Sequence, residues 1–340
     1  MKRGFDNSRY NFIQENEILK RAEKYERFYL EFGGHLTYDG HASRVLPGYN
    51  PRTKLNILRA LSKIPGGLEI IYCVNANDIQ SLKRLGDFKL NYTKQSLRDI
   101  KILKRKVSKN IYVVITRYSK KNYKAVFDFK KKIAEFVKKI YTHNEIPNYI
   151  KSPEYAIKGY KKNPYIKLKS KLIVVTGAAG GSGKMATAMS QIYHDSKNKI
   201  NSGYAKFETF PVWNLPLNHP INLAYEAATA DLQDKNKIDF YHLKHYKIKS
   251  VNYNRDIKNF SILMKLANLI TKSKSAFGYH SPTDMGIGNT KSGIIDDKIC
   301  REASIKEIYR RMKVYTKEYN SGRENKKTLD RMKEIIKRIE

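Results

Sequence analysis

A glycine-rich segment in the middle of the chain carries the clearest chemical signal. Residues 177–184 read Gly-Ala-Ala-Gly-Gly-Ser-Gly-Lys and directly follow the β-branched run Leu172–Thr176. Backbone amides in such a turn can converge on an anion, and a helix that begins at Lys184 directs the positive end of its dipole to the same point. The segment therefore predicts a phosphate-binding loop in which Lys184 neutralises charge on the outer phosphate oxygens.

The residues expected to bind a phosphate-bearing cofactor are Gly177, Gly180, Gly181, Ser182, Gly183, Lys184 and Thr187. The sequence departs twice from the standard phosphate-loop pattern. Ala178 stands where the first glycine is expected, and Met185 stands where a serine or threonine would hold Mg²⁺. A bound metal ion would therefore take some of its ligands from elsewhere in the chain.

The same loop has two other interpretations. Residues 176–183 also fit the Thr-Gly-x-x-x-Gly-x-Gly pattern of short-chain dehydrogenases, which bind NAD(P) and need a catalytic Tyr-x-x-x-Lys pair. The chain contains three such pairs, Tyr165/Lys169, Tyr193/Lys197 and Tyr309/Lys313. A chain so rich in tyrosine and lysine produces pairs of this kind by chance. Alternatively, the glycines only form a tight strand-to-helix turn.

Charged residues after the loop complete the candidate active site. Glu208 lies near the end of the expected strand Tyr204–Phe210, and ligand groups gather at the carboxyl ends of parallel strands. We therefore expect Glu208 to act as a metal ligand or general base, and Lys184 and Glu208 are the two catalytic candidates. Asp231 is the second candidate metal ligand, and Lys206 is a candidate substrate ligand.

Four more residues are candidate substrate ligands. Asp39, His41 and Arg44 occupy a glycine-containing loop, where Arg44 could clamp a phosphate or carboxylate through two hydrogen bonds. A hydrogen-bonded turn with Asp39 at its corner explains the same residues equally well. Arg255 precedes an expected helix and is a candidate anion ligand.

The elements that position these residues alternate along the chain. A helix capped at Asn7 or Ser8, with Ile18, Ala22, Tyr25 and Tyr29 on one face, is expected to end near Phe32. A second helix after Pro51 leads into the apolar strand Leu68–Val74. The strand Asn110–Thr116 follows, with a helix over residues 123–140. Strands that alternate with helices predict parallel βαβ units.

The predicted fold class is α/β, with two Rossmann-like parallel-sheet units and a helical C-terminal extension. Three prolines and many Lys and Tyr residues over 144–169 predict a domain boundary. The predicted domains are an N-terminal α/β domain over residues 1–160, an α/β domain with the phosphate loop over residues 161–275, and the start of a C-terminal region over residues 276–340. That region ends in two highly charged helices, which we expect to be exposed.

Composition limits the classes of partner. The formal net charge is +35, from 67 Lys and Arg residues against 32 Asp and Glu. Lysine accompanies heavy Asn, Ile and Tyr usage, which A/T-rich codons explain, and it occurs in every segment, so we expect no nucleic-acid partner. The chain lacks an apolar run of membrane-spanning length and an apolar N-terminal leader, which predicts a cytoplasmic protein that does not enter a membrane.

Several blocks resemble one family, the proteins named for domain of unknown function 1846, or UPF0371. The blocks are Lys2–Asn7, Tyr29–Gly48, Gly203–Asp231, Val251–Asp256 and Ser281–Gly286. The resemblance covers essentially the whole chain. It implies a loop with prolines at the positions of Ala178 and Ala179, and a chain here that lacks the C-terminal third of the family. Because it implies no settled biochemical role, it strengthens the fold prediction and leaves the chemistry open.

Together, the residues predict a protein that binds a nucleotide or a phosphorylated small molecule. The leading hypothesis is an enzyme of ATP-linked phosphoryl transfer or hydrolysis, with ATP or another nucleotide and Mg²⁺ as cofactors. The alternatives are an NAD(P)-binding oxidoreductase of the short-chain type and a non-catalytic ligand-binding or assembly module. The sequence names neither the substrate nor the oligomeric state, and a homo-oligomer is compatible with it.

Overall fold

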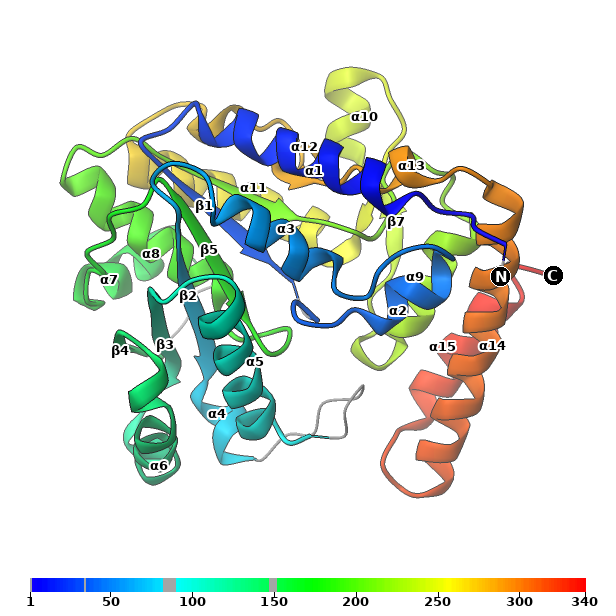
Figure 1. The fold of residues 1–340 in the computed structure, drawn as a ribbon, viewed down its shortest axis with the longest axis horizontal. Coiled ribbons are helices and arrows are strands. Elements are labelled where there is room, and N and C mark those ends of the chain that lie inside the picture. Colours follow the sequence, from blue (N-terminus) through cyan, green and yellow to red (C-terminus); the bar gives the residue numbers. More distant parts are fainter. Residues whose placement is uncertain (1, 34, 82–89, 147–151) are drawn as a thin grey trace.

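The computed structural model describes residues 2–33, 35–81, 90–146 and 152–340 (Figure 1). Its centre is a seven-stranded, fully parallel sheet in the order β4-β3-β2-β5-β1-β6-β9. These strands are β1 (Arg27–Phe32), β2 (Leu68–Asn75), β3 (Ile111–Tyr118), β4 (Lys139–Asn144), β5 (Leu172–Gly177), β6 (Ser202–Phe207) and β9 (Gly286–Ile287). A separate antiparallel pair is formed by β7 (Asn236–Ile238) and β8 (Val251–Tyr253). The chain is an α/β protein.

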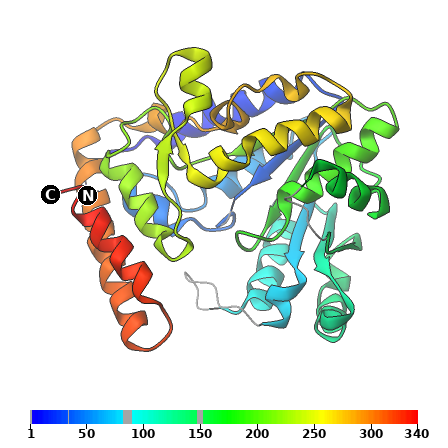
Figure 2. The ribbon, with the colours of Figure 1, turned by 180° about the vertical axis from the view of Figure 1, so that it is seen from behind.

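Helices cover both faces of the sheet. One face packs against α1 (Asn7–Ala22), α3 (Thr53–Leu61), α5 (Tyr92–Lys106) and α6 (Tyr123–Ile133). The other face packs against α7 (Pro153–Lys162), α8 (Lys184–Lys197) and α11 (Asn254–Thr271), which lie in front when the molecule is seen from behind (Figure 2). The remaining α-helices are α2 (Gly40–Val45), α4 (Ala76–Gln80), α9 (Pro220–Ala228), α10 (Phe240–Tyr246), α12 (Pro282–Met285), α13 (Thr290–Gly293), α14 (Asp297–Asn320) and α15 (Lys326–Ile336).

Strand alternation builds the two cores. In β2, Ile70, Tyr72 and Val74 point to the face covered by α1, α3 and α5, whereas Ile71 and Cys73 point to the face covered by α8. Every residue of β2 is buried, as expected for a parallel strand with helices on both sides. This double burial explains why the central strands are continuous apolar runs in the sequence.

The order of the strands contains one reversal. From β2 the chain adds β3 and β4 on one side, and it then returns to place β5 on the other side of β2. The strands β6 and β9 lie further in that second direction. In open parallel sheets, such a switch point leaves a crevice outside the carboxyl ends of the two strands. In this sheet the switch point falls between β2 and β5.

The strands and helices around the glycine loop are where the sequence predicts them. The strands predicted at Leu68–Val74, Asn110–Thr116 and Leu172–Thr176 correspond to β2, β3 and β5, and a helix begins at Lys184. Two predictions are wrong. The first predicted helix begins close to the expected position, at Asn7, but it ends at Ala22 and not near Phe32, because Arg27–Phe32 form β1. The helix predicted to reach residue 140 ends earlier, and β4 occupies its last part.

One sheet contains strands from all three predicted domains. The strands β1 to β4 come from residues 1–160, β5 and β6 from residues 161–275, and β9 from residues 276–340. The charged C-terminal helices also contribute to the interior. Ile308 on α14 and both Met332 and Ile335 on α15 are fully buried in the same core as α1 and α3. Among the described helices, none combines the length and the apolar character needed to cross a membrane.

A buried ion pair connects β1 to the second half of the chain. The Asp195 carboxylate, in the last turn of α8, is fully buried and pairs with the Arg27 guanidinium. It also accepts hydrogen bonds of 2.7 Å each from Tyr29, Tyr165 and Ser202. This carboxylate therefore joins α8 to β1, to β6 and to the segment that precedes β5.

We predict that Asp195→Ala lowers the free energy of unfolding by about 3–5 kcal/mol, because it leaves a buried guanidinium without its partner. Urea denaturation followed by circular dichroism measures this loss. The control is Asp128→Ala, since Asp128 is exposed on α6. Equal, small losses for the two variants would contradict a structural role for the buried pair.

Candidate functional site

The glycine loop lies at the switch point of the sheet. β5 ends at Gly177 and α8 begins at Lys184, so residues 178–183 turn at the carboxyl edge. Gly183 precedes the helix at φ +83°, and no side chain caps the helix. Within the described part of the chain, the first three amides of α8, those of Lys184, Met185 and Ala186, have no acceptor. Such amides form a binding site for an anion.

Side chains from the two neighbouring strands hold the loop in place. The Asn75 amide, at the end of β2, donates to the Gly181 carbonyl at 3.3 Å. The Thr116 hydroxyl, in β3, donates to the Ser182 carbonyl at 2.9 Å. Because the N–H of a trans peptide points opposite to its C=O, these contacts turn the amides of Ser182 and Gly183 away from β2 and β3.

Two positions in the loop require glycine. A Cβ atom at Gly177 would lie 2.5 Å from the Cys73 carbonyl oxygen, and one at Gly183 would lie 2.8 Å from Thr116 Cγ2. Gly183 also has a left-handed backbone, which side chains disfavour. The loop is therefore pressed closely against β2 and β3. Gly180 and Gly181 are exposed and have open space around them.

The hydroxyl groups of the loop lie beneath it. Ser182 and Thr176 are fully buried, and their hydroxyl oxygens have no hydrogen-bond partner among the described residues. Thr187 is also fully buried, and its hydroxyl lies against Cys73. Burial raises the pKa of the Cys73 thiol to about 12, and the Thr187 hydroxyl acts in the opposite direction. Thr187 therefore supports the loop from below.

The Lys184 ammonium group lies against the loop. Its Nζ is 3.4 Å from the Ala179 carbonyl oxygen and 3.9 Å from Glu31 Oε1, and the residue is only 7% exposed. Glu31 belongs to β1, the strand on the other side of β5 from β2. At 3.9 Å this pair is at the long limit for an ion pair.

A second group of charged residues lies beside Glu31. Glu31 is in register with Lys206 of β6, and the Lys206 ammonium donates to Asp256, in the first turn of α11, at 2.7 Å. The Tyr204 hydroxyl donates to Glu31 at 2.6 Å. Burial acts to lower the pKa of Lys206, but the carboxylates of Asp256 and Glu31 outweigh it and hold that pKa above its usual value. Lys206 therefore stays charged.

Glu208 has a strongly perturbed pKa. It follows β6 directly, and burial raises its pKa to about 8. The charge of Lys206 opposes this shift, whereas Asp256 and Glu31 add to it. No side chain or backbone group in the described ranges forms a hydrogen bond with the Glu208 carboxyl. A carboxyl with this pKa can donate and accept a proton near neutral pH, as general acid–base catalysis requires.

Three predicted substrate ligands are engaged elsewhere. Asp39 caps α2 and pairs with Lys54 at 2.8 Å. Burial acts to raise the pKa of Asp39, but the Lys54 charge lowers it to about 2. His41 and Arg44 both contact Glu307 of α14, at 3.4 and 2.9 Å. These contacts join α2 to α14 and to α3, and none of them involves the glycine loop.

The remaining predicted ligands also have partners within the protein. Arg255 pairs with Asp234 at 2.9 Å, although its side chain is 54% exposed. Asp231 accepts a hydrogen bond from Tyr315 of α14 at 3.2 Å. Over the ranges that the structure describes, no three His, Cys, Asp or Glu residues are grouped so that they could hold a metal ion. The structure thus does not bring Glu208 and Asp231 together in such a group.

Sequence analysis did not identify four residues of the site. The sequence could have indicated Asn75 and Thr116, because each is a polar residue near the end of a buried parallel strand. No sequence pattern indicated Glu31, because its strand was predicted as a helix. No pattern indicated Asp256, in the first turn of α11, either, because its partner Lys206 is 50 residues away in the sequence.

The sheet and its loop define an α/β protein with a glycine-rich turn at the switch point. The chain belongs to the family described as "Domain of unknown function DUF1846, N-terminal", whose model matches residues 3–340. The resemblance predicted from the sequence blocks is therefore confirmed.

The relatives are longer than this chain. A UPF0371 protein of Clostridium tetani (strain Massachusetts / E88) is 45% identical over 338 residues, which are 99% of this chain and 66% of the relative. One from Clostridium botulinum (strain Alaska E43 / Type E3) is 42% identical, over 100% of this chain and 67% of the relative. Another, from strain Kyoto / Type A2, is 43% identical and is covered to 66%. The chain thus spans about two thirds of these relatives.

We predict that Glu208 makes the stability of the protein fall as the pH rises. Its pKa of about 8 in the folded state exceeds the value of 4.5 for a free glutamic acid, so the folded state binds this proton more tightly. The free energy of unfolding should fall between these two pH values, by at most about 1.4 kcal/mol per pH unit. Glu208→Gln, which mimics the protonated acid, should remove this slope. Urea denaturation across this pH range tests it, and parallel pH profiles would contradict the assignment.

Proposed function

We propose that the crevice at the carboxyl edge binds a nucleotide or another phosphorylated small molecule, with Gly177–Lys184 around its phosphates. One observation carries the proposal. Asn75 and Thr116 hold the carbonyls of Gly181 and Ser182, which directs the following amides away from the sheet, next to a helix whose first amides are uncapped. Amides held in this way lose little entropy when they meet an anion.

The neighbouring charges suit ATP-linked phosphoryl transfer or hydrolysis. Lys184 would neutralise charge on the transferred phosphoryl group. Glu208 would take the proton from the attacking water or substrate hydroxyl, because a base with a pKa near the working pH is the most effective. The attacking oxygen then forms its bond to the γ-phosphorus while the bond from that phosphorus to the bridging oxygen breaks. Mg²⁺ bound with the nucleotide would be held largely by phosphate oxygens, as is common for this ion.

The tyrosines of the dehydrogenase-type pairs favour this chemistry over hydride transfer. The Tyr165 hydroxyl donates to Asp195, inside the buried ion-pair cluster. Lys197 lies over the Tyr193 ring in the last turn of α8, at the opposite end of the helix from the loop. Tyr309 lies on α14 and is exposed. None of the three contacts a residue of the loop in the described part of the chain.

We predict that Lys184→Ala weakens binding of a non-hydrolysable ATP analogue about tenfold or more, because one charge-assisted contact to phosphate is lost. Isothermal titration calorimetry measures the affinity, and circular dichroism checks that the variant is folded. Lys197→Ala is the matched control, since it removes a lysine at the other end of the same helix. Equal affinities for Lys184→Ala and the unmodified protein would remove the basis of the proposal.

We predict the opposite effect for Glu31→Gln. The substitution keeps an acceptor for the Tyr204 hydroxyl and removes the charge that competes for Lys184. Inorganic tripolyphosphate, measured in EDTA so that no metal intervenes, should therefore bind several-fold more tightly. If Glu31→Gln only lowers the melting temperature and leaves tripolyphosphate binding unchanged, Lys184 serves the fold and not a ligand.

A further inference from the structure

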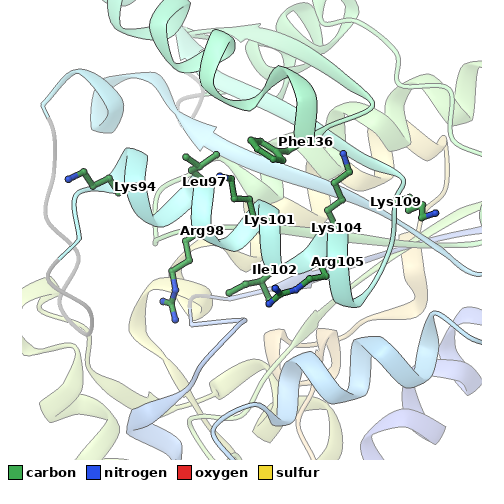
Figure 3. Close-up of a pocket in the computed structure, with 9 residues that line it drawn as sticks. All are labelled: Lys94, Leu97, Arg98, Lys101, Ile102, Lys104, Arg105, Lys109 and Phe136. Carbon is green, nitrogen blue, oxygen red and sulfur yellow. The ribbon is translucent and has the colours of Figure 1, made fainter.

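A second feature, separate from the glycine loop, is a basic hollow along α5. It is a groove of about 960 Å³ beside that helix (Figure 3). The residues that line it are Lys94, Leu97, Arg98, Lys101, Ile102, Lys104, Arg105, Lys109 and Phe136. The charged side chains leave the helix in several directions, with Lys94 and Lys109 near its two ends and Arg98 and Lys104 on opposite sides (Figure 3).

The basic residues form a row on one face of α5. Lys94, Arg98, Lys101 and Arg105 follow one another at spacings of four, three and four, which places them on the same side of a helix. Like charges at these spacings destabilise a helix. The buried residues of α5 lie on the opposite side of the helix, so packing against the protein core does not require these basic residues. An anionic partner bound along the row would offset this destabilisation.

Charge is concentrated in the segment that contains this row. Residues 94–139 have 16 Lys and Arg against three Asp and Glu, a net charge of +13 over 46 residues, whereas the whole chain has +35 over 340. Codon bias would add lysine evenly, so this excess needs another cause. Among the described residues, no lysine of this segment forms an ion pair with a carboxylate.

Aromatic rings accompany the charges. The ammonium groups of Lys101 and Lys104 lie 4.3 and 5.8 Å from the centre of the Phe136 ring, which orders them at the groove. On the adjacent helix α6, Tyr123 and Phe127 are 57% and 43% exposed, and their rings are stacked at 6.0 Å. Exposed stacked rings next to lysines are the combination on which unpaired bases bind.

We propose that the α5–α6 surface binds single-stranded nucleic acid, with phosphates at the exposed side chains Lys94, Lys101 and Arg105 and unpaired bases on Tyr123 and Phe127. This proposal revises the expectation from sequence that nucleic acid is not a partner. Six of the nine residues that line the groove are basic, and a concave basic surface fits a phosphate backbone better than a flat anionic membrane. The exposed ring pair favours single strands over duplexes.

The test is a charge reversal with a matched control. Fluorescence anisotropy measures binding of a fluorescein-labelled single-stranded oligonucleotide of mixed sequence to Lys101→Glu/Arg105→Glu and to Lys313→Glu/Lys317→Glu. Both pairs have a spacing of four and change the net charge equally, and Lys313 and Lys317 are exposed on α14, at the other end of the molecule (Figure 1). We expect the α5 pair alone to weaken binding about tenfold or more, with a salt slope shallower by about 1.4.

Phe127→Ala separates stacking from charge. It should weaken binding of the single strand and leave a duplex of the same sequence unaffected, because paired bases do not reach the ring. Equal losses for the two charge reversals would show attraction to net charge alone and overturn the proposal. Binding to anionic phospholipid vesicles without binding to the oligonucleotide would also overturn it, in favour of a membrane. Binding of the ATP analogue should be unchanged in the α5 pair, so this test stands apart from that of the glycine loop.

Discussion

The reversal of strand order between β2 and β5 is the constraint on which the site depends. Because the chain leaves these adjacent strands in opposite directions, no connection crosses the space above their carboxyl ends. The glycine turn fills the β5 side of that space, and the ends of β2 and β3 supply the amide and the hydroxyl that fix its carbonyls. Gly177 and Gly183 are the points where the turn touches those strands. The arrangement of the loop therefore follows from three features: the strand topology, the hydrogen bonds from Asn75 and Thr116, and the absence of a side chain at Gly177 and at Gly183.

The charges beside the loop form a balanced set. Glu31, Glu208 and Asp256 face Lys184 and Lys206 in a partly buried space, where charges interact more strongly than in water. In the proposed function, the ammonium groups of Lys184 and Lys206 would offset the negative charge of a bound polyphosphate, so that Glu208 can lose its proton and act as the base.

The sequence predicts the centre of this protein better than its edges. The strands β2, β3 and β5 are buried on both faces and therefore read as continuous apolar runs, and the glycines between β5 and α8 mark the turn. The strand β1 was missed because a run as short as Phe28–Leu30 has no periodicity that separates strand from helix. Partners far apart in sequence, such as His41 and Glu307 or Lys206 and Asp256, leave no local pattern at all. The basic row on α5 is visible in the sequence, but the hollow beside it is a property of the folded surface.

The position of β1 determines when the sheet can be completed. This strand lies between β5 and β6, which follow it by well over a hundred residues, so its place does not exist until the chain has been synthesised past Phe207. Until then its apolar residues lack both neighbouring strands. Contacts this distant in sequence slow folding, and a waiting hydrophobic strand is a target for aggregation or for a chaperone. The N-terminal segment is thus among the first parts made and among the last to find its place, while β2, β3 and β4 can pair with one another long before it does.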